Sequence, residues 1–112
     1  MNADNIKSQM RKGYLEYCIL LILKKKPAYT SDIISELKDA KLIVVEGTLY
    51  PLLTRLKNGE LLDYKWEEST QGPPRKYYEM TVHGQNFLDE LESSWEEINN
   101  VVKKIKASPN NL

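Results

Sequence analysis

Residues 46–62 read EGTLYPLLTRLKNGELL, and residues 71–84 read QGPPRKYYEMTVHG. In the first segment the leucines at positions 49, 52, 53 and 56 have the spacing of one buried helical face. Between the two segments, residues 62–67 alternate between apolar and charged side chains, which is the period of a half-buried strand. The Gly-Pro-Pro turn that follows leads into a returning strand at 75–80. These segments predict a helix over about 47–58 followed by a β-hairpin with a long tip.

Two more helices and a strand are expected before this unit. Residues 6–25 are apolar on most faces, which predicts one helix buried on several sides and ended by Pro27. Thr30 or Ser31 is expected to cap a second helix. The β-branched run at residues 42–45 predicts a short edge strand.

The last helix is expected to start after a Thr81 cap and to reach about Lys106. Its apolar residues follow a 3-4-3-4-3 spacing, a seam of about two and a half heptads. Such a seam could pack onto its own domain, but the first helix is also apolar, and together they favour an interface with a second copy of the chain. The seam consists of Leu88, Leu91, Trp95, Ile98, Val102 and Ile105.

The expected fold class is mainly α with a small β-hairpin wing. We expect a winged helix-turn-helix DNA-binding domain at residues 1–80 and a C-terminal dimerisation helix at residues 81–108. A chain of 112 residues suits one domain with one modest core.

Composition excludes several classes of function. The longest apolar run is six residues, at 18–23, against the ~18 that a membrane span needs, and no signal-peptide pattern is present. A single cysteine, Cys18, cannot form an intramolecular disulfide, which favours the cytoplasm. Because neither Cys18 nor the only histidine, His83, has a carboxylate cluster nearby in sequence, we expect no metal site, no cofactor and no catalysis.

The net charge is zero, but the charges are unevenly distributed. Residues 47–58 and 69–78 carry cations and no acid, whereas residues 89–97 carry only acids. The two basic segments coincide with the predicted third helix and hairpin, which makes these two elements the candidate contact surface for duplex DNA.

Three segments resemble the PadR family of bacterial transcription regulators. They are RKGYLEYCILLIL at 11–23 and the two segments quoted above, and the resemblance covers roughly residues 10–106. The single C-terminal helix is similar to that of the short PadR subfamily. The resemblance implies a dimeric, repressor-type regulator with its third helix in the major groove and its wing beside it. Residues 43–46, IVVE, depart from the more polar lead-in of many relatives.

The candidate DNA contacts lie on the outward face of the third helix and just after the wing tip. A recognition helix enters the major groove N-terminal end first, so Thr48, Tyr50 and Pro51 are expected nearest to the bases. Arg55 is expected at a phosphate, and the wing cations at the backbone or the minor groove. The full set is Thr48, Tyr50, Pro51, Thr54, Arg55, Lys57, Arg75 and Lys76. An ordinary solvated helix face, a protein-binding winged helix and a small-molecule sensor are the alternatives.

Trp95 carries a ligand hypothesis. An indole in the middle of the seam is too wide for tight packing of two helices, so two copies of Trp95 could flank a gap suited to a planar aromatic effector. The resemblance implies the same class of ligand, since some PadR regulators respond to phenolic or drug-like aromatics. The alternative is that Trp95 packs on the first helix, near Tyr14 or Tyr17.

Overall fold

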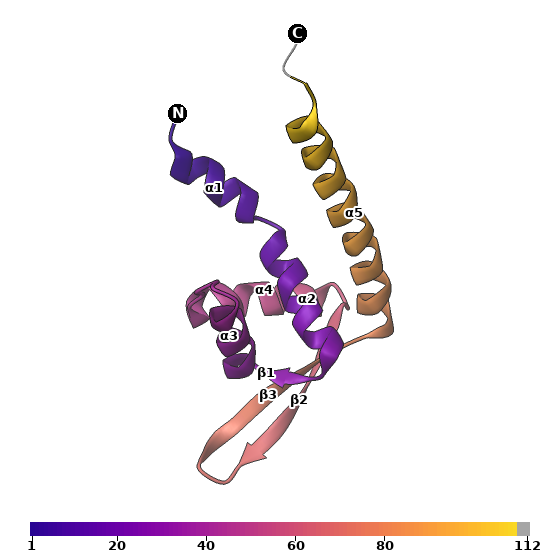
Figure 1. The fold of residues 1–112 in the computed structure, drawn as a ribbon. Coiled ribbons are helices and arrows are strands. Elements are labelled where there is room, and N and C mark those ends of the chain that lie inside the picture. The colour runs from indigo at the N-terminus through magenta and orange to yellow at the C-terminus, as the bar shows by residue number, and fades with distance from the viewer. Residues whose placement is uncertain (110–112) are drawn as a thin grey trace.

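The computed structural model describes residues 1–109, and Figure 1 shows its helices with a small antiparallel sheet at one end. The strand order is β1-β3-β2, with β2 and β3 forming the projecting hairpin. The predicted class, mainly α with a β-hairpin wing on a helix-turn-helix, is confirmed. Within residues 1–109, no helix is both long and apolar enough to cross a membrane. The elements are α1 (Ala3–Arg11), α2 (Tyr14–Lys25), β1 (Ala28–Tyr29), α3 (Thr30–Asp39), α4 (Glu46–Asn58), β2 (Leu62–Ser69), β3 (Gly72–Met80) and α5 (Val82–Ala107).

The prediction of one helix over residues 6–25 is wrong, because the chain turns between α1 and α2. Lys12 is extended, and Gly13 has a φ of 85°, a left-handed conformation that glycine adopts without strain. The periodic pattern did not reveal this break because a single glycine is tolerated inside many helices. None of the α1 residues is buried.

The predicted edge strand at residues 42–45 is also wrong. The third strand is β1, in which Ala28 pairs with Tyr78 and Tyr29 with Tyr77 of β3. Residues 42–45 instead form the connection from α3 to α4, and the Leu42 N–H completes the end of α3 by bonding to the Leu37 carbonyl at 2.8 Å.

The N-terminal cap of α5 is the residue predicted from the sequence, whereas the cap of α3 lies one residue before the first predicted candidate. Thr81 caps α5, with its hydroxyl accepting the Gly84 N–H at 2.9 Å, as predicted. At α3 the cap is Tyr29, not Thr30 or Ser31, and the Asp32 carboxylate accepts the Tyr29 N–H at 3.1 Å. The chain thus passes directly from β1 into α3.

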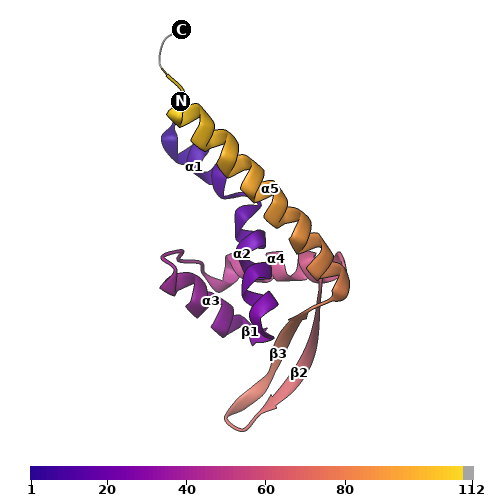
Figure 2. The same cartoon turned by 45° about the vertical axis from the view of Figure 1, so that its right-hand side comes forward.

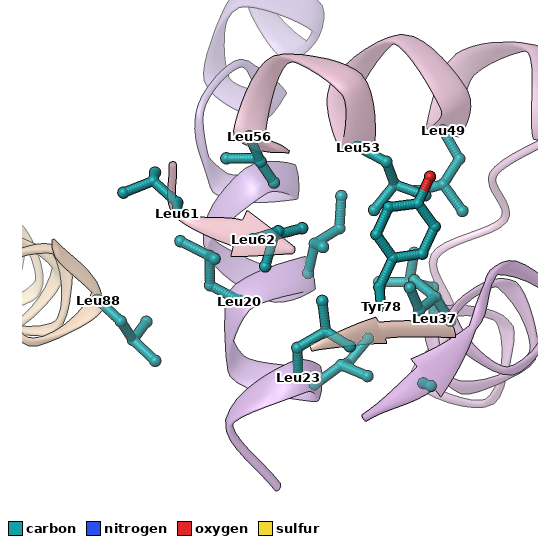
Figure 3. Close-up of a cluster of buried hydrophobic side chains, with 14 of the residues drawn as sticks. Leu20, Leu23, Leu37, Leu49, Leu53, Leu56, Leu61, Leu62, Tyr78 and Leu88 are labelled. Carbon is teal, nitrogen blue, oxygen red and sulfur yellow. The ribbon is translucent and has the colours of Figure 1, made fainter. Parts of the chain in front are cut away.

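The core lies between α2, α3, α4, the base of the hairpin and the first turns of α5 (Figure 3). Leu49 and Leu53 of α4 are completely buried, and the Tyr78 ring of β3 lies beneath them. Burial raises the pKa of Tyr78. This packing fixes α4 against the wing, so the surfaces of these two elements have a defined relative orientation.

Only the first part of α5 belongs to this core. Leu88, the first residue of the predicted dimer seam, is completely buried within the protomer, and Leu91 packs against the core as a half-buried residue. The rest of α5 and all of α1 extend beyond the domain, at the end of the molecule opposite to the hairpin tip in both views (Figures 1 and 2).

Candidate nucleic-acid interface

Helix α4 presents its outward face to solvent because its leucines point inward. Leu49 and Leu53 are fully buried and Leu56 is 3% exposed, whereas Tyr50, Pro51 and Thr54 are exposed. Pro51 lies in the second turn of the helix. The centre of the outward face therefore consists of Tyr50, Pro51 and Thr54, none of which carries a charge.

On one flank of α4, predicted contact residues converge with the wing. Lys57 places its Nζ 5.8 Å from the centre of the Tyr64 ring on β2. Lys76 of β3 lies over the same ring at 4.4 Å and over the Trp66 ring at 5.4 Å. Cation–π attraction of this kind holds an ammonium group without neutralising it. Lys57 and Lys76 thus meet at the Tyr64 ring, and Lys76 also lines a concave surface together with Tyr50.

On the opposite flank, the predicted contacts are separated from the wing. The Arg55 guanidinium pairs with the Glu16 carboxylate of α2 at 2.5 Å, and the Arg55 side chain remains largely exposed. Arg55 lines a hollow of about 530 Å³ together with Arg11 and Lys12 at the turn between α1 and α2. Thr48 lies nearby, in a hollow formed with Tyr14 and the connection at residues 42–45. The structure thus divides the predicted set between two flanks of one helix.

Arg75 is positioned by the start of α3. Its guanidinium carbon lies 3.8 Å from the centre of the Tyr29 ring, and its Nη2 donates to the Ser31 hydroxyl at 3.0 Å. The Tyr29 hydroxyl donates to the Glu67 carboxylate at 2.5 Å, a hydrogen bond that raises the pKa of Tyr29. Arg75 therefore has a defined position, although it is exposed near the hairpin tip.

A concave surface of about 300 Å³ lies between α3, α4 and the wing. Its lining contains one acid, Glu46, and two cations, Arg75 and Lys76, and a second acid, Glu67, is hydrogen-bonded to the lining residue Tyr29. Its walls also include Ser31 and Trp66, which the sequence did not identify as contact residues. The sequence signal for Trp66 is its place in the apolar alternation of β2, which predicts that it is half-buried. Trp66 is instead 61% exposed.

The seam of α5 beyond Leu91 is an exposed apolar strip. Trp95 and Ile98 are 43% and 56% exposed, and Val102 and Ile105 continue the strip at 43% and 70%. The Trp95 ring lies 5.9 Å from the ring of Tyr17 on α2, one of the two tyrosines named in the packing alternative. One side of the indole is therefore covered by the protomer while much of it remains accessible.

Groups for catalysis or metal binding are dispersed. Among residues 1–109, no three side chains of His, Cys, Asp or Glu are gathered closely enough to hold a metal ion. Cys18 is partly buried, and burial raises the pKa of its thiol, which disfavours the reactive thiolate. His83 is exposed on the first turn of α5.

Comparison with known proteins agrees with this geometry. Residues 19–90 match the Transcriptional regulator PadR-like family. A PadR-like transcription factor of known structure from Bacteroides fragilis is 70% identical, covers 90% of this chain and 98% of its own, and superposes with a TM-score of 0.80. A PadR-like transcriptional regulator from Bacillus cereus is 34% identical, with coverage of 90% and 99% and a TM-score of 0.79. An uncharacterised protein from Lysinibacillus sphaericus is 28% identical over 100 residues, which are 87% of this chain and 92% of that protein.

The matched residues 19–90 include β1, α3, α4, both wing strands and the first part of α5, and so contain the whole concave surface. The chain therefore belongs to the PadR-like family of transcriptional regulators.

Proposed function

We propose that this regulator binds a pseudo-palindromic operator as a homodimer and represses transcription from it. The observation that carries the proposal is the continuous surface formed by the exposed face of α4 and the cationic, aromatic face of the wing. With α4 in the major groove, the wing reaches the adjacent backbone and minor groove. Repression then requires only that the bound dimer exclude polymerase from an overlapping promoter.

We propose distinct roles for the contact residues. Tyr50, Pro51 and Thr54 face the base edges from the exposed side of α4. Lys57, Arg75 and Lys76 contact phosphates, which fix the position of the helix in the groove. Thr48 and Arg55 meet the DNA from the other flank, where Arg55 must exchange its Glu16 partner for a phosphate.

The test is a salt titration of binding to labelled duplex DNA from the host genome. Each phosphate contact contributes about 0.9 to the slope of log K against log salt concentration. Arg75→Gln is expected to weaken binding and to flatten this slope. Lys65→Gln is the matched control, since Lys65 is a wing cation that lies outside the lining of the concave surface and 4.0 Å from Glu79. Absence of salt-dependent binding to any duplex would contradict the proposal.

We propose that the dimer forms through α1 and the part of α5 beyond Leu91. The exposed apolar strip of α5 continues for about three turns, and α1 carries exposed Ile6 and Met10 without burying any residue. Contiguous apolar surface of this kind is typical of an interface. The proposed dimerisation unit is thus shorter than residues 81–108, because the first turns of α5 belong to the DNA-binding domain.

Two charged substitutions test the interface. Ile98→Asp with Val102→Asp places carboxylates in the strip and is expected to give a folded monomer in sedimentation experiments. Ser93→Asp with Asn100→Asp is the matched control, because both residues are exposed and Asn100 lies about half a turn from Ile98 and Val102 on the same helix. A dimer that survives the first pair of substitutions would place the interface elsewhere.

We further propose that a planar aromatic molecule releases the operator by binding at Trp95. In a two-fold dimer, the accessible side of Trp95 would face its symmetry mate across the apolar strip, while Tyr17 supports the other side. Such a ligand lowers operator affinity only if it binds the DNA-incompetent dimer more tightly than the competent one.

Tryptophan fluorescence tests this ligand site. In a Trp66→Phe variant, Trp95 is the only indole, and quenching by planar aromatic dyes would report binding beside it. The same dyes should lower the operator affinity of the unmodified protein and leave that of Trp95→Phe unchanged. No quenching across a diverse panel would reject the sensor role.

A further inference from the structure

One face of the wing continues past the point where the core ends. Leu62, Tyr64 and Trp66 alternate along β2, and Tyr64 and Trp66 lie opposite Tyr78 and Lys76 of β3. The exposure along β2 rises from 2% at Leu62 to 61% at Trp66, because α4 covers only the base of this face. The apolar side of the hairpin therefore emerges into solvent at Trp66.

Trp66 has an aromatic and a cationic neighbour although it is exposed. Its ring lies edge-on to the Tyr64 ring, with centroids 6.0 Å apart and planes at 86°. Lys76, its cross-strand partner, keeps Nζ over both rings. An indole fixed by an aromatic neighbour and a cation loses little conformational entropy when it binds another molecule.

The wall opposite Trp66 belongs to the helix-turn-helix. Tyr50 of α4 is 45% exposed and lines the same concave surface, together with Ser31 and Arg75. The surface thus has aromatic rings on both walls and cations at the wing. Deoxyribose presents C–H groups to an aromatic ring and is joined to a phosphate on each side, so a DNA backbone offers a partner both for an indole and for a cation.

We propose that Trp66 is a DNA-contact residue whose indole packs on a deoxyribose at the edge of the minor groove, while Lys76 Nζ pairs with the adjoining phosphate. This inference rests on the proposed function, since it assumes that α4 lies in the major groove next to that backbone strand. The contact reads no base, so it adds affinity to all operators alike.

The indole and ammonium contributions respond differently to salt, and this difference provides the first test. Trp66→Ala is expected to weaken duplex binding about tenfold, within the range seen for aromatic contacts to nucleic acid, with the salt slope unchanged. Lys76→Gln is expected to weaken binding and to reduce the slope by about one per protomer. Trp66→Phe should recover part of the affinity, and Lys65→Gln should alter neither quantity.

Fluorescence provides a test that does not depend on affinity. In Trp95→Phe the only indole is Trp66, and a saturating duplex is expected to shift its emission to shorter wavelength or quench it, because DNA covers the ring. Circular dichroism confirms that each variant is folded, which is expected because Trp66 contributes little to the core.

The outcomes separate this inference from the proposed function. Salt-dependent binding by the unmodified protein, together with equal affinity of Trp66→Ala and an unchanged Trp66 spectrum on DNA, would overturn the inference and leave the proposed function standing. A Trp66→Ala variant that flattens the salt slope as Lys76→Gln does would also overturn it, since the ring would then act only by positioning the cation. If the unmodified protein binds no duplex, the proposed function fails first.

Discussion

Gly84→Ala should destabilise the protein, although alanine is the better helix former. Gly84 lies in the first turn of α5, where a Cβ atom would come 2.1 Å from the Leu61 carbonyl oxygen and 2.8 Å from Met80 Cγ. The Leu61 oxygen is backbone and already accepts the Thr81 N–H at 3.1 Å, so it cannot yield without disturbing the junction of β2 and α5. Overpacking costs about 3 kcal/mol, and the helix propensity of alanine returns about 1 kcal/mol, which leaves a net loss of about 2 kcal/mol.

Gly47→Ala is the matched control. Gly47 is also in the first turn of its helix, α4, but a Cβ there would meet no atom within 4 Å. This substitution should raise stability by up to about 1 kcal/mol, so the two variants should differ by about 3 kcal/mol. Urea unfolding followed by circular dichroism at one fixed protomer concentration measures the difference. If Gly84→Ala matches or exceeds the unmodified protein in stability, the close packing of α5 on Leu61 is refuted.

Three further predictions concern the contact surface and its support. Arg55→Gln should weaken duplex binding less than Arg75→Gln does, because a phosphate contact of Arg55 must first displace Glu16; an equal or larger loss of affinity would contradict this cost. Tyr50→Ala should change the preference between operator variants by about 1–3 kcal/mol in competition binding, and a large fall in melting temperature instead would place this ring in the core. Thr81→Val should lower the free energy of unfolding by about 1–2 kcal/mol through loss of the α5 cap, and an unchanged urea midpoint would contradict that role.

Sequence periodicity correctly predicted the elements in which one face of a helix or strand is buried. The leucines of α4 and the alternation of residues 62–67 each describe one buried face, and both elements form where expected. Two of the errors, the single helix over residues 6–25 and the strand at residues 42–45, concern how elements are arranged relative to one another. The two residues of β1 form a strand only because the edge of β3 is available to them, and the left-handed Gly13 follows from the path between α1 and α2.

The sequence indicated which residue types form the candidate site, but it did not indicate how these residues pair or how deeply they are buried. Sequence periodicity placed Arg55 and Lys57 on one exposed face, but it could not show that Glu16, 39 residues earlier, pairs with Arg55. It also assigned Trp66 to the buried side of β2 correctly by alternation, but the extent of burial depends on where α4 ends. The exposure of an aromatic residue near the end of a strand therefore depends on which neighbouring elements cover it. The sequence of the strand alone does not give this information.

The charge distribution explains how a neutral chain can present a DNA-binding surface. Away from the wing face, some cations form ion pairs, as Lys24 does with Glu92 and Lys25 with Glu36. On the wing side, Lys57, Arg75 and Lys76 lie over aromatic rings, and in the part of the chain that the structure describes none of the three forms an ion pair. A ring attracts a cation without cancelling its charge, so these side chains are ordered yet remain available to a phosphate. Because a phosphate contact then displaces no carboxylate, most of its electrostatic free energy contributes to binding, and the net charge of the chain predicts little about it.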